Sequence, residues 1–93
     1  MDEARRMGEH LRQWRIVLGL SQELAAERAD VSLPTLRRVE KGDPGVKLGS
    51  FLAVARVLNV AEGIVVATDP LETELGRLRA PLLGRQRARR RTP

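Results

Sequence analysis

Cysteine is absent from this sequence of 93 residues, and His10 is the sole histidine. A disulfide framework and a thiolate metal site are therefore excluded, and one histidine cannot form a metal cluster by itself. No apolar run approaches the roughly 20 residues that a bilayer-spanning helix needs, and the N-terminus lacks an apolar signal segment. We expect a soluble cytoplasmic protein that binds no metal or other cofactor and has no membrane partner.

Features of catalytic sites are also scarce. The chain offers no cysteine nucleophile, no glycine loop of the type that cradles phosphates and no evident pair of carboxylates. The sequence therefore predicts that the protein is not an enzyme.

The net charge of +5 comes entirely from the C-terminal segment. Residues 1–69 contain ten Lys plus Arg and ten Asp plus Glu, whereas residues 70–93 contain seven Arg and two Glu. A positive net charge is typical of proteins that bind nucleic acid, but residues 1–69 could bind DNA only through local placement of charge. The tail would add a salt-sensitive, sequence-independent attraction to phosphates. A chain of this length forms one small domain whose core is only just large enough to be stable, so a partner subunit would help.

Two short helices joined by a tight turn are predicted within residues 21–40. Ser21 and Ser32 are suited to cap helix N-termini, because a serine hydroxyl accepts a hydrogen bond from a free backbone N–H of the first turn. Asp30 stands where a left-handed residue would end the first helix, and aspartate tolerates that conformation better than most residues do.

The second of these helices, residues 33–40, has two distinct faces. The outward face is short and basic, which is the form of a recognition helix that enters a DNA major groove with its N-terminal residues leading. The inward arc holds Leu33, Leu36, Val39 and Glu40, and the outward arc holds Pro34, Thr35, Arg37, Arg38 and Lys41.

Three short segments carry a resemblance to a known family. They are Gly-Leu-Ser-Gln at 19–22, Val-Ser at 31–32 and Leu-Arg-Arg-Val-Glu-Lys-Gly at 36–42. Together they resemble the helix-turn-helix signature of the Cro and phage-repressor-like (Xre-type) transcriptional regulators, over about residues 7–67.

The resemblance implies an all-α, five-helix, lambda-repressor-like domain over residues 1–68. Such a domain binds double-stranded operator DNA as a homodimer and acts as a repressor or autorepressor. The chain departs from the family pattern at Ala25, where leucine is usual, and at Asp30, where glycine is usual.

Contacts with the DNA backbone are expected from three polar residues. Gln22 begins the first motif helix, where free N–H groups and the helix dipole suit a phosphate, and in the family a glutamine here grips the backbone. The loop from Lys41 to Lys47 follows the backbone in the family, which makes both lysines candidates, although Asp43 opposes them. The alternative is that these residues are ordinary solvated surface.

Base edges would be read from the start and the outward face of the second motif helix. Thr35, Arg37 and Arg38 supply polar groups, while Leu33 and Pro34 supply apolar contacts to thymine methyl groups. The complete set of expected DNA-binding residues is Gln22, Ser32, Leu33, Pro34, Thr35, Arg37, Arg38, Lys41 and Lys47.

Two opposite charges stand on otherwise apolar arcs. Arg15 lies on a helix predicted from Glu3 to Leu18, and Glu40 lies on the inward arc of the recognition helix. This placement suggests that the two side chains meet, and in the family an Arg and a Glu at these positions form a largely buried pair. The alternative is that each reaches water separately. The apolar arc around Arg15 consists of Ala4, Met7, Leu11, Trp14 and Leu18.

A further helix is predicted from Leu48 to Leu58, with Asn59 in the left-handed position that follows a helix. Its apolar arc is wider than one small core needs, which marks an interface. By resemblance to related repressors, the candidate dimer contacts are Val54, Val57, Val60, Ile64 and Val65. The alternative is that a last helix folds back and covers them within one chain.

The two remaining segments are less regular. Residues 60–68 are predicted to form a short helix by resemblance, with an edge strand as the alternative because Ile64, Val65 and Val66 are β-branched. Residues 69–93 form an extension in which four leucines are spaced to line a weak helix, namely Leu71, Leu75, Leu78 and Leu82.

The arginine-rich stretch at 84–93 is predicted to be disordered when free, as a basic arm for phosphates or as a solubilising tail. The sequence Asp69-Pro70-Leu71, with Gly76 and the terminal arginines, also resembles the extension of regulators encoded beside kinase-like toxins. That second resemblance implies an antitoxin with a toxin protein as its partner.

Overall fold

The computed structural model describes residues 2–85, and every regular element in that range is helical. The predicted all-α fold is therefore confirmed. The chain divides into two compact units, one reaching Glu62 and the other beginning at Gly63. The domain boundary expected from the sequence, after Thr68, lies six residues beyond this division and stays a prediction.

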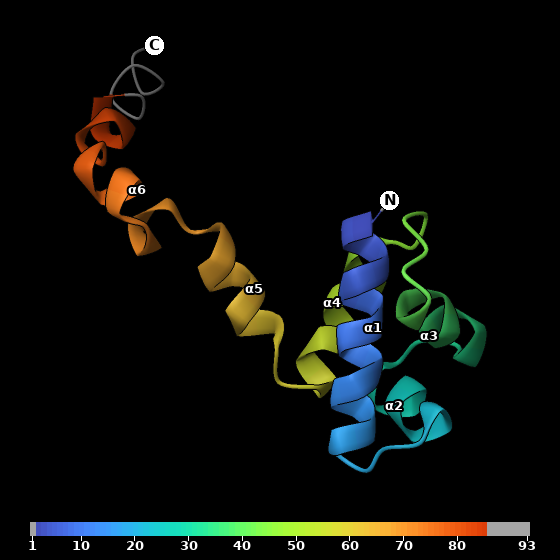
Figure 1. The fold of residues 1–93 in the computed structure, drawn as a ribbon. Coiled ribbons are helices and arrows are strands. Elements are labelled where there is room, and N and C mark those ends of the chain that lie inside the picture. Colours follow the sequence, from blue (N-terminus) through green and yellow to red (C-terminus); the bar gives the residue numbers. More distant parts are fainter. Residues whose placement is uncertain (1, 86–93) are drawn as a thin grey trace. The chain divides into compact units, whose positions relative to one another are not determined.

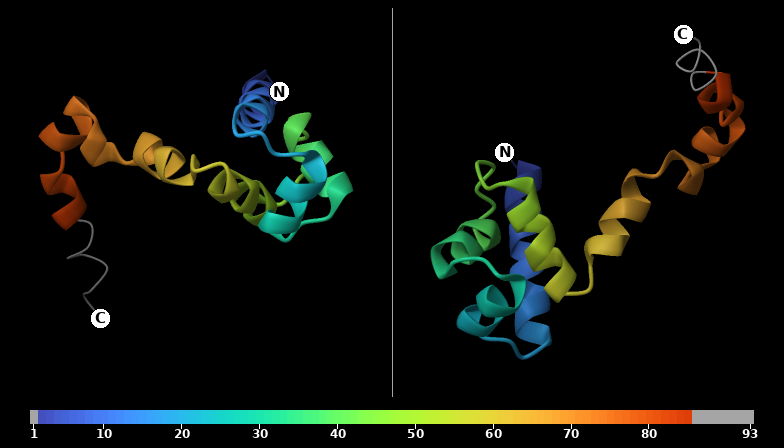
Figure 2. Two further views of the ribbon diagram at one scale, coloured as in Figure 1. Left: turned by 90° about the horizontal axis from the view of Figure 1, so that it is seen from below. Right: turned by 180° about the vertical axis from the view of Figure 1, so that it is seen from behind.

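The first unit contains four helices, which are α1 (Asp2–Val17), α2 (Gln22–Ala29), α3 (Leu33–Glu40) and α4 (Leu48–Val57) (Figure 1). Helix α3 contacts each of the other three, and α2 also packs against α4. The two further views in Figure 2 show the same packing of these four helices. The short helix α3 is thus the element that the rest of this unit holds in place.

Local capping fixes where the helices begin and end, as the sequence predicted. The Ser21 hydroxyl accepts a hydrogen bond from the Leu24 backbone N–H at 3.0 Å, and the Ser32 hydroxyl accepts one from Thr35 N–H at 3.2 Å. Asp30 and Asn59 adopt the left-handed conformation, with φ of 55° and 62°. Asp30 can replace the usual glycine because this conformation costs aspartate less than it costs most residues.

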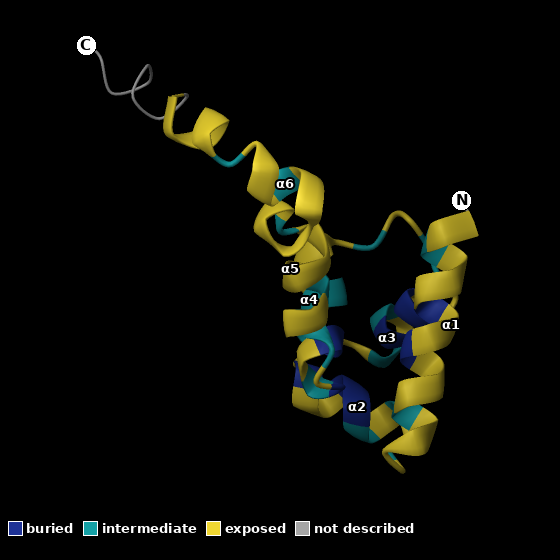
Figure 3. Cartoon of the chain, turned by 60° about the vertical axis from the view of Figure 1, so that its left-hand side comes forward, coloured by how far each residue is buried: buried dark blue, intermediate teal, exposed yellow. Residues whose placement is uncertain are grey.

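The core of the first unit lies among all four helices, α1 contributing Leu11, and buried residues gather there in Figure 3. Its largest fully buried side chains are Leu36, Val39, Val54 and Leu58. On α2 the buried residues are alanines, and Ala25 is completely covered. Small side chains let α2 approach α3 and α4 closely, so leucine is not required at position 25.

Helix α1 packs through only part of the predicted arc, in which Leu11 is buried and Ala4 and Arg15 are half-buried. Its buried residues are Gly8 and Leu11, whereas Met7, Trp14 and Leu18 remain 43–47% exposed. A Cβ atom on Gly8 would lie 2.6 Å from the Val39 carbonyl oxygen. The missing side chain therefore lets the α1 backbone touch the end of α3, which an apolar-periodicity argument cannot detect.

Helix α5 (Ala61–Thr68) crosses the division between the units, and its helical form settles the choice between helix and edge strand at residues 60–68. The second unit continues with the 3₁₀ helix η1 (Pro70–Glu72) and with α6 (Glu74–Leu78), which pack against each other. No residue from Gly63 to Arg85 is buried. Five leucines there are 46–77% exposed, namely Leu71, Leu75, Leu78, Leu82 and Leu83.

Most of the arginine-rich stretch lies outside the described residues, including Arg87, Arg89, Arg90 and Arg91. The described residues include no helix with the length and apolar character that crossing a membrane requires.

Candidate nucleic-acid interface

The outward face of α3 is exposed while its inward face anchors the core. Leu36 and Val39 are 0% and 2% exposed, whereas Arg37 and Arg38 lie on the surface. Pro34 is in the first turn, where no intrahelical N–H is needed. The two arginines therefore project from a backbone that the core holds from behind.

The residues at the start of α3 are only partly available to a ligand. Ser32 and Pro34 are exposed, and Thr35 is half-buried. The Ser32 hydroxyl donates a hydrogen bond to the Thr35 hydroxyl oxygen at 2.8 Å, so these two polar groups are held together. Leu33 is half-buried and packs against the core, which limits the surface that it can offer to a thymine methyl group.

Arg15 and Glu40 form the ion pair that their placement on apolar arcs suggested. The guanidinium Nε donates to the Glu40 carboxylate at 2.6 Å, and the two side chains are only 12% and 4% exposed. Arg15 also donates to the Leu20 carbonyl oxygen at 2.9 Å. The pair therefore ties α1 both to the C-terminal end of α3 and to the residue just before the Ser21 cap.

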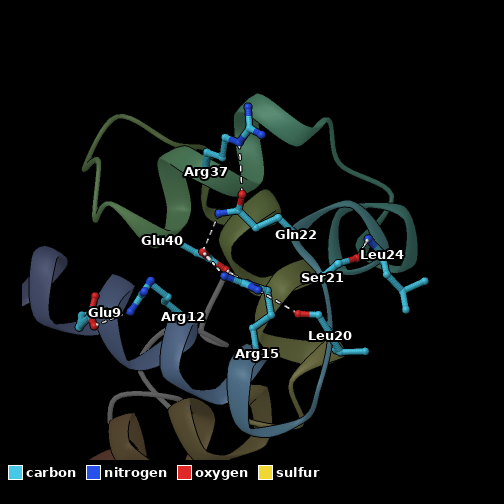
Figure 4. Close-up of polar contacts among 9 residues, drawn as sticks. All are labelled: Glu9, Arg12, Arg15, Leu20, Ser21, Gln22, Leu24, Arg37 and Glu40. Atoms are coloured by element: carbon cyan, nitrogen blue, oxygen red, sulfur yellow. Dashed lines mark hydrogen bonds and ion pairs between the residues drawn. The ribbon is translucent and has the colours of Figure 1, made fainter.

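Gln22 links this ion pair to the recognition helix, as the close-up in Figure 4 shows. Its amide nitrogen donates to Glu40 at 3.1 Å, and its amide oxygen accepts from the Arg37 Nε at 3.3 Å. The first residue of α2 thus orients an exposed arginine of α3. This contact uses the side chain of Gln22 but leaves the free backbone N–H groups of the α2 N-terminus for an anion.

Arg38 is held by the loop that follows α3. Its Nε donates to the Asp43 carboxylate at 2.8 Å, and the other Asp43 oxygen accepts from the Gly45 backbone N–H, also at 2.8 Å. The hydrogen bond from Arg38, followed by the one from Gly45, lowers the pKa of Asp43 below its usual value. Sequence reasoning recognised Asp43 as an opposing charge but missed that it pairs with Arg38.

Lys41 and Lys47, the two lysines expected to contact phosphates, are both exposed. Lys41 follows the last turn of α3, and Lys47 precedes α4 without a side-chain capping bond. Neither forms a salt bridge with another residue in the range 2–85. Their ammonium groups are therefore available to an external anion.

One of the five candidate dimer residues was wrongly assigned. Val54 is 1% exposed and belongs to the core, so its side chain cannot reach a second copy. The error arose because α4 packs against both α2 and α3, which needs a wider apolar arc than one neighbour would. Val57 and Val60 are half-buried beside the core, Ile64 is half-buried, and Val65 is 56% exposed.

No group of three or more His, Asp or Glu side chains in the part of the chain that the structure describes is arranged to hold a metal ion. What the described residues do present is a buried polar network that supports an exposed, basic short helix.

Comparison with known families agrees with this geometry. A family model described as a helix-turn-helix domain matches residues 6–66, which include α2, the turn and α3. The chain belongs to the helix-turn-helix domain family. It is accordingly a DNA-binding regulator, of a family that is typically non-enzymatic. No curated protein and no solved structure matches the chain.

Proposed function

We propose that this helix-turn-helix protein is a homodimeric transcriptional repressor or autorepressor that acts by occupying its operator. The observation that carries the proposal is the pair of exposed arginines, Arg37 and Arg38, on a helix whose opposite face is fully buried. A short helix of this kind fits the major groove, which is about 12 Å wide. It would act in the cytoplasm, without catalysis and without a cofactor.

The proposed contacts divide into two classes. Gln22, Ser32, Lys41 and Lys47 would fix the register of the domain by binding backbone phosphates, which carry no sequence information directly. Thr35, Arg37 and Arg38 would read base edges, and Pro34, with the exposed part of Leu33, would contact thymine methyl groups. The Arg38–Asp43 hydrogen bond uses the Nε–H, which leaves the terminal guanidinium N–H groups of Arg38 to donate to a base.

Dimerisation would place two copies of α3 in successive major grooves. The candidates that remain for this contact are Val57 and Val60 of the first unit and Ile64 and Val65 of the second, which are all at least partly exposed. Half-sites should then lie about 34 to 36 Å apart, or one helical turn of DNA. Light scattering of the purified protein should give about twice the chain mass of 10.4 kDa.

Selection of bound sites from random duplex DNA tests the proposal. The full-length protein should enrich an inverted repeat with half-sites about one helical turn apart. A single unrepeated half-site would support DNA reading but contradict the homodimer. Failure to enrich any sequence would contradict the function itself.

The second candidate is an antitoxin that binds and neutralises a toxin protein and regulates its own operon. Its support comes from the second unit, where no described residue is buried and several leucines are exposed. Exposed apolar surface of this kind marks a protein contact. Co-purification with the product of an adjacent gene would favour this candidate, and an isolated gene would count against it.

A further inference from the structure

A concavity of about 780 Å³ lies beside α3 within the first unit. Its wall is built by α1, by the first residue of α2 and by the last turn of α3. Five cationic side chains line it, which are Arg5, Arg6, Arg12, Arg37 and Lys41. Figure 4 shows part of this wall, where Arg12, Gln22 and Arg37 lie around Glu40.

Two glycines bring the α1 side of the wall against α3. A Cβ on Gly8 would lie 2.6 Å from both the Val39 oxygen and the Gly42 nitrogen. A Cβ on Gly42 would collide with the backbone of Ala4 and Arg5. The two backbones are therefore in direct contact, and this contact fixes Arg5 beside the end of α3 where Lys41 stands.

The acidic groups of the wall are already partnered, but three of its cations are not. The matched ion pairs are Asp2–Arg6 at 3.8 Å, Glu9–Arg12 at 3.1 Å and Glu40–Arg15 at 2.6 Å. Arg5, Arg37 and Lys41 form no salt bridge with any residue that the structure describes. Arg37 donates only to the neutral Gln22 amide. The concavity thus carries an unbalanced positive charge.

We propose that this concavity binds one backbone phosphate beside the major groove, with Arg5 of α1 acting together with Lys41. The inference rests on the proposed function and extends the DNA interface onto a helix outside the helix-turn-helix. A phosphate oxygen accepts charge-assisted hydrogen bonds from guanidinium and ammonium groups, and Arg5 and Lys41 have no carboxylate competing for theirs.

The position of the concavity favours a DNA phosphate over a free anion. A helix lying in a major groove about 12 Å wide has a sugar–phosphate strand on each side of it. The concavity flanks α3 and includes Gln22 at the α2 N-terminus, where free backbone N–H groups are suited to bind an anion. A DNA strand whose sugar–phosphate backbone passes Gln22 would continue over Arg5 and Lys41.

Salt dependence of binding measures this contact. We would determine the affinity for the selected operator at several salt concentrations, for the full-length protein and for Arg5→Ala. Losing one phosphate contact should reduce the slope of log K against log[salt] by about 0.9, with the preferred sequence unchanged. The control Arg56→Ala removes the same charge from an exposed position on α4 that does not line the concavity. An Arg5→Ala slope equal to that of the control would overturn the proposal.

Phosphate ethylation interference locates the contact. Ethylating one particular phosphate beside each half-site should weaken binding of the full-length protein several-fold but have little effect on Arg5→Ala. If no phosphate behaves in this way while inorganic phosphate alone saturates the Arg5 resonance, the concavity is a small-anion site and the proposal is wrong. If the full-length protein selects no DNA sequence at all, the proposed function fails first and this inference fails with it. If the full-length protein selects a sequence but Arg5→Ala gives the same ethylation-interference pattern, the inference is wrong and the proposed function still stands.

Discussion

Arg38 donates a 2.8 Å hydrogen bond to the carboxylate of Asp43, five residues further along the chain. The side chain proposed to read a base is therefore positioned by the loop after α3 before any DNA is present. The pair is partly exposed, with 51% of the Arg38 side chain and 39% of the Asp43 side chain accessible. Solvent competes for such a bond, so DNA can displace it at low cost.

Asp43 should titrate at a lower pH than an ordinary aspartate. Hydrogen bonds from Arg38 and from the Gly45 backbone lower its pKa in the folded state. A lowered folded pKa means that the group stabilises the fold above the usual aspartate pKa and loses this contribution as the pH falls through the folded value. Side-chain carboxyl NMR should show the midpoint below that of an ordinary aspartate, and Arg38→Ala should move it upward. An unchanged midpoint in Arg38→Ala would show that the two side chains do not pair in solution.

Removing Glu40 should destabilise the first unit strongly. Glu40→Ala leaves the Arg15 guanidinium buried without its partner, which costs about 3 to 5 kcal/mol. The matched control is Glu9→Ala, which breaks the exposed Glu9–Arg12 pair and should change the free energy of unfolding by less than about 1 kcal/mol. Urea unfolding of both variants measures the difference. Equal effects of the two substitutions would mean that the Arg15–Glu40 pair is no more important than a surface pair.

The sequence predicted the features that depend on local chemistry. Ser21, Ser32 and Asp30 act as caps because the residue type alone suits each position. The outward face of α3 also follows directly from helical periodicity, because Leu36 and Val39 are spaced to share one side.

Long-range features could not be predicted in the same way. The Gly8–Gly42 backbone contact leaves no apolar signal, so the predicted arc of α1 included Leu11 correctly but also extended over Met7, Trp14 and Leu18, which stay exposed. Asp43 looked like a charge that opposes DNA, because only the fold of the loop shows that it holds Arg38. The role of Arg5 likewise depends on how α1 meets α3.

Truncation after Thr68 should weaken DNA binding but keep its sequence preference. The removed residues 69–93 include seven arginines, and a basic segment adds an attraction that does not depend on sequence. The truncated protein should therefore show a shallower dependence of affinity on salt. Fluorescence anisotropy on the selected operator and on a scrambled duplex, at several salt concentrations, measures the sequence preference and the salt dependence of affinity. If affinity and slope stay as in the full chain, the arginines of the extension do not touch DNA.

Site selection with Arg38→Ala is the most direct test of the claim that the outward face of α3 reads bases. Each well-formed contact from an arginine to a guanine discriminates by about 1 to 3 kcal/mol. Selection from random DNA with this variant should therefore lose preference at one position of each half-site and keep the rest of the motif, while Arg56→Ala selects the motif of the unaltered protein. An Arg38→Ala motif identical to that of the unaltered protein would show that Arg38 reads no base and would contradict the recognition role given to this face.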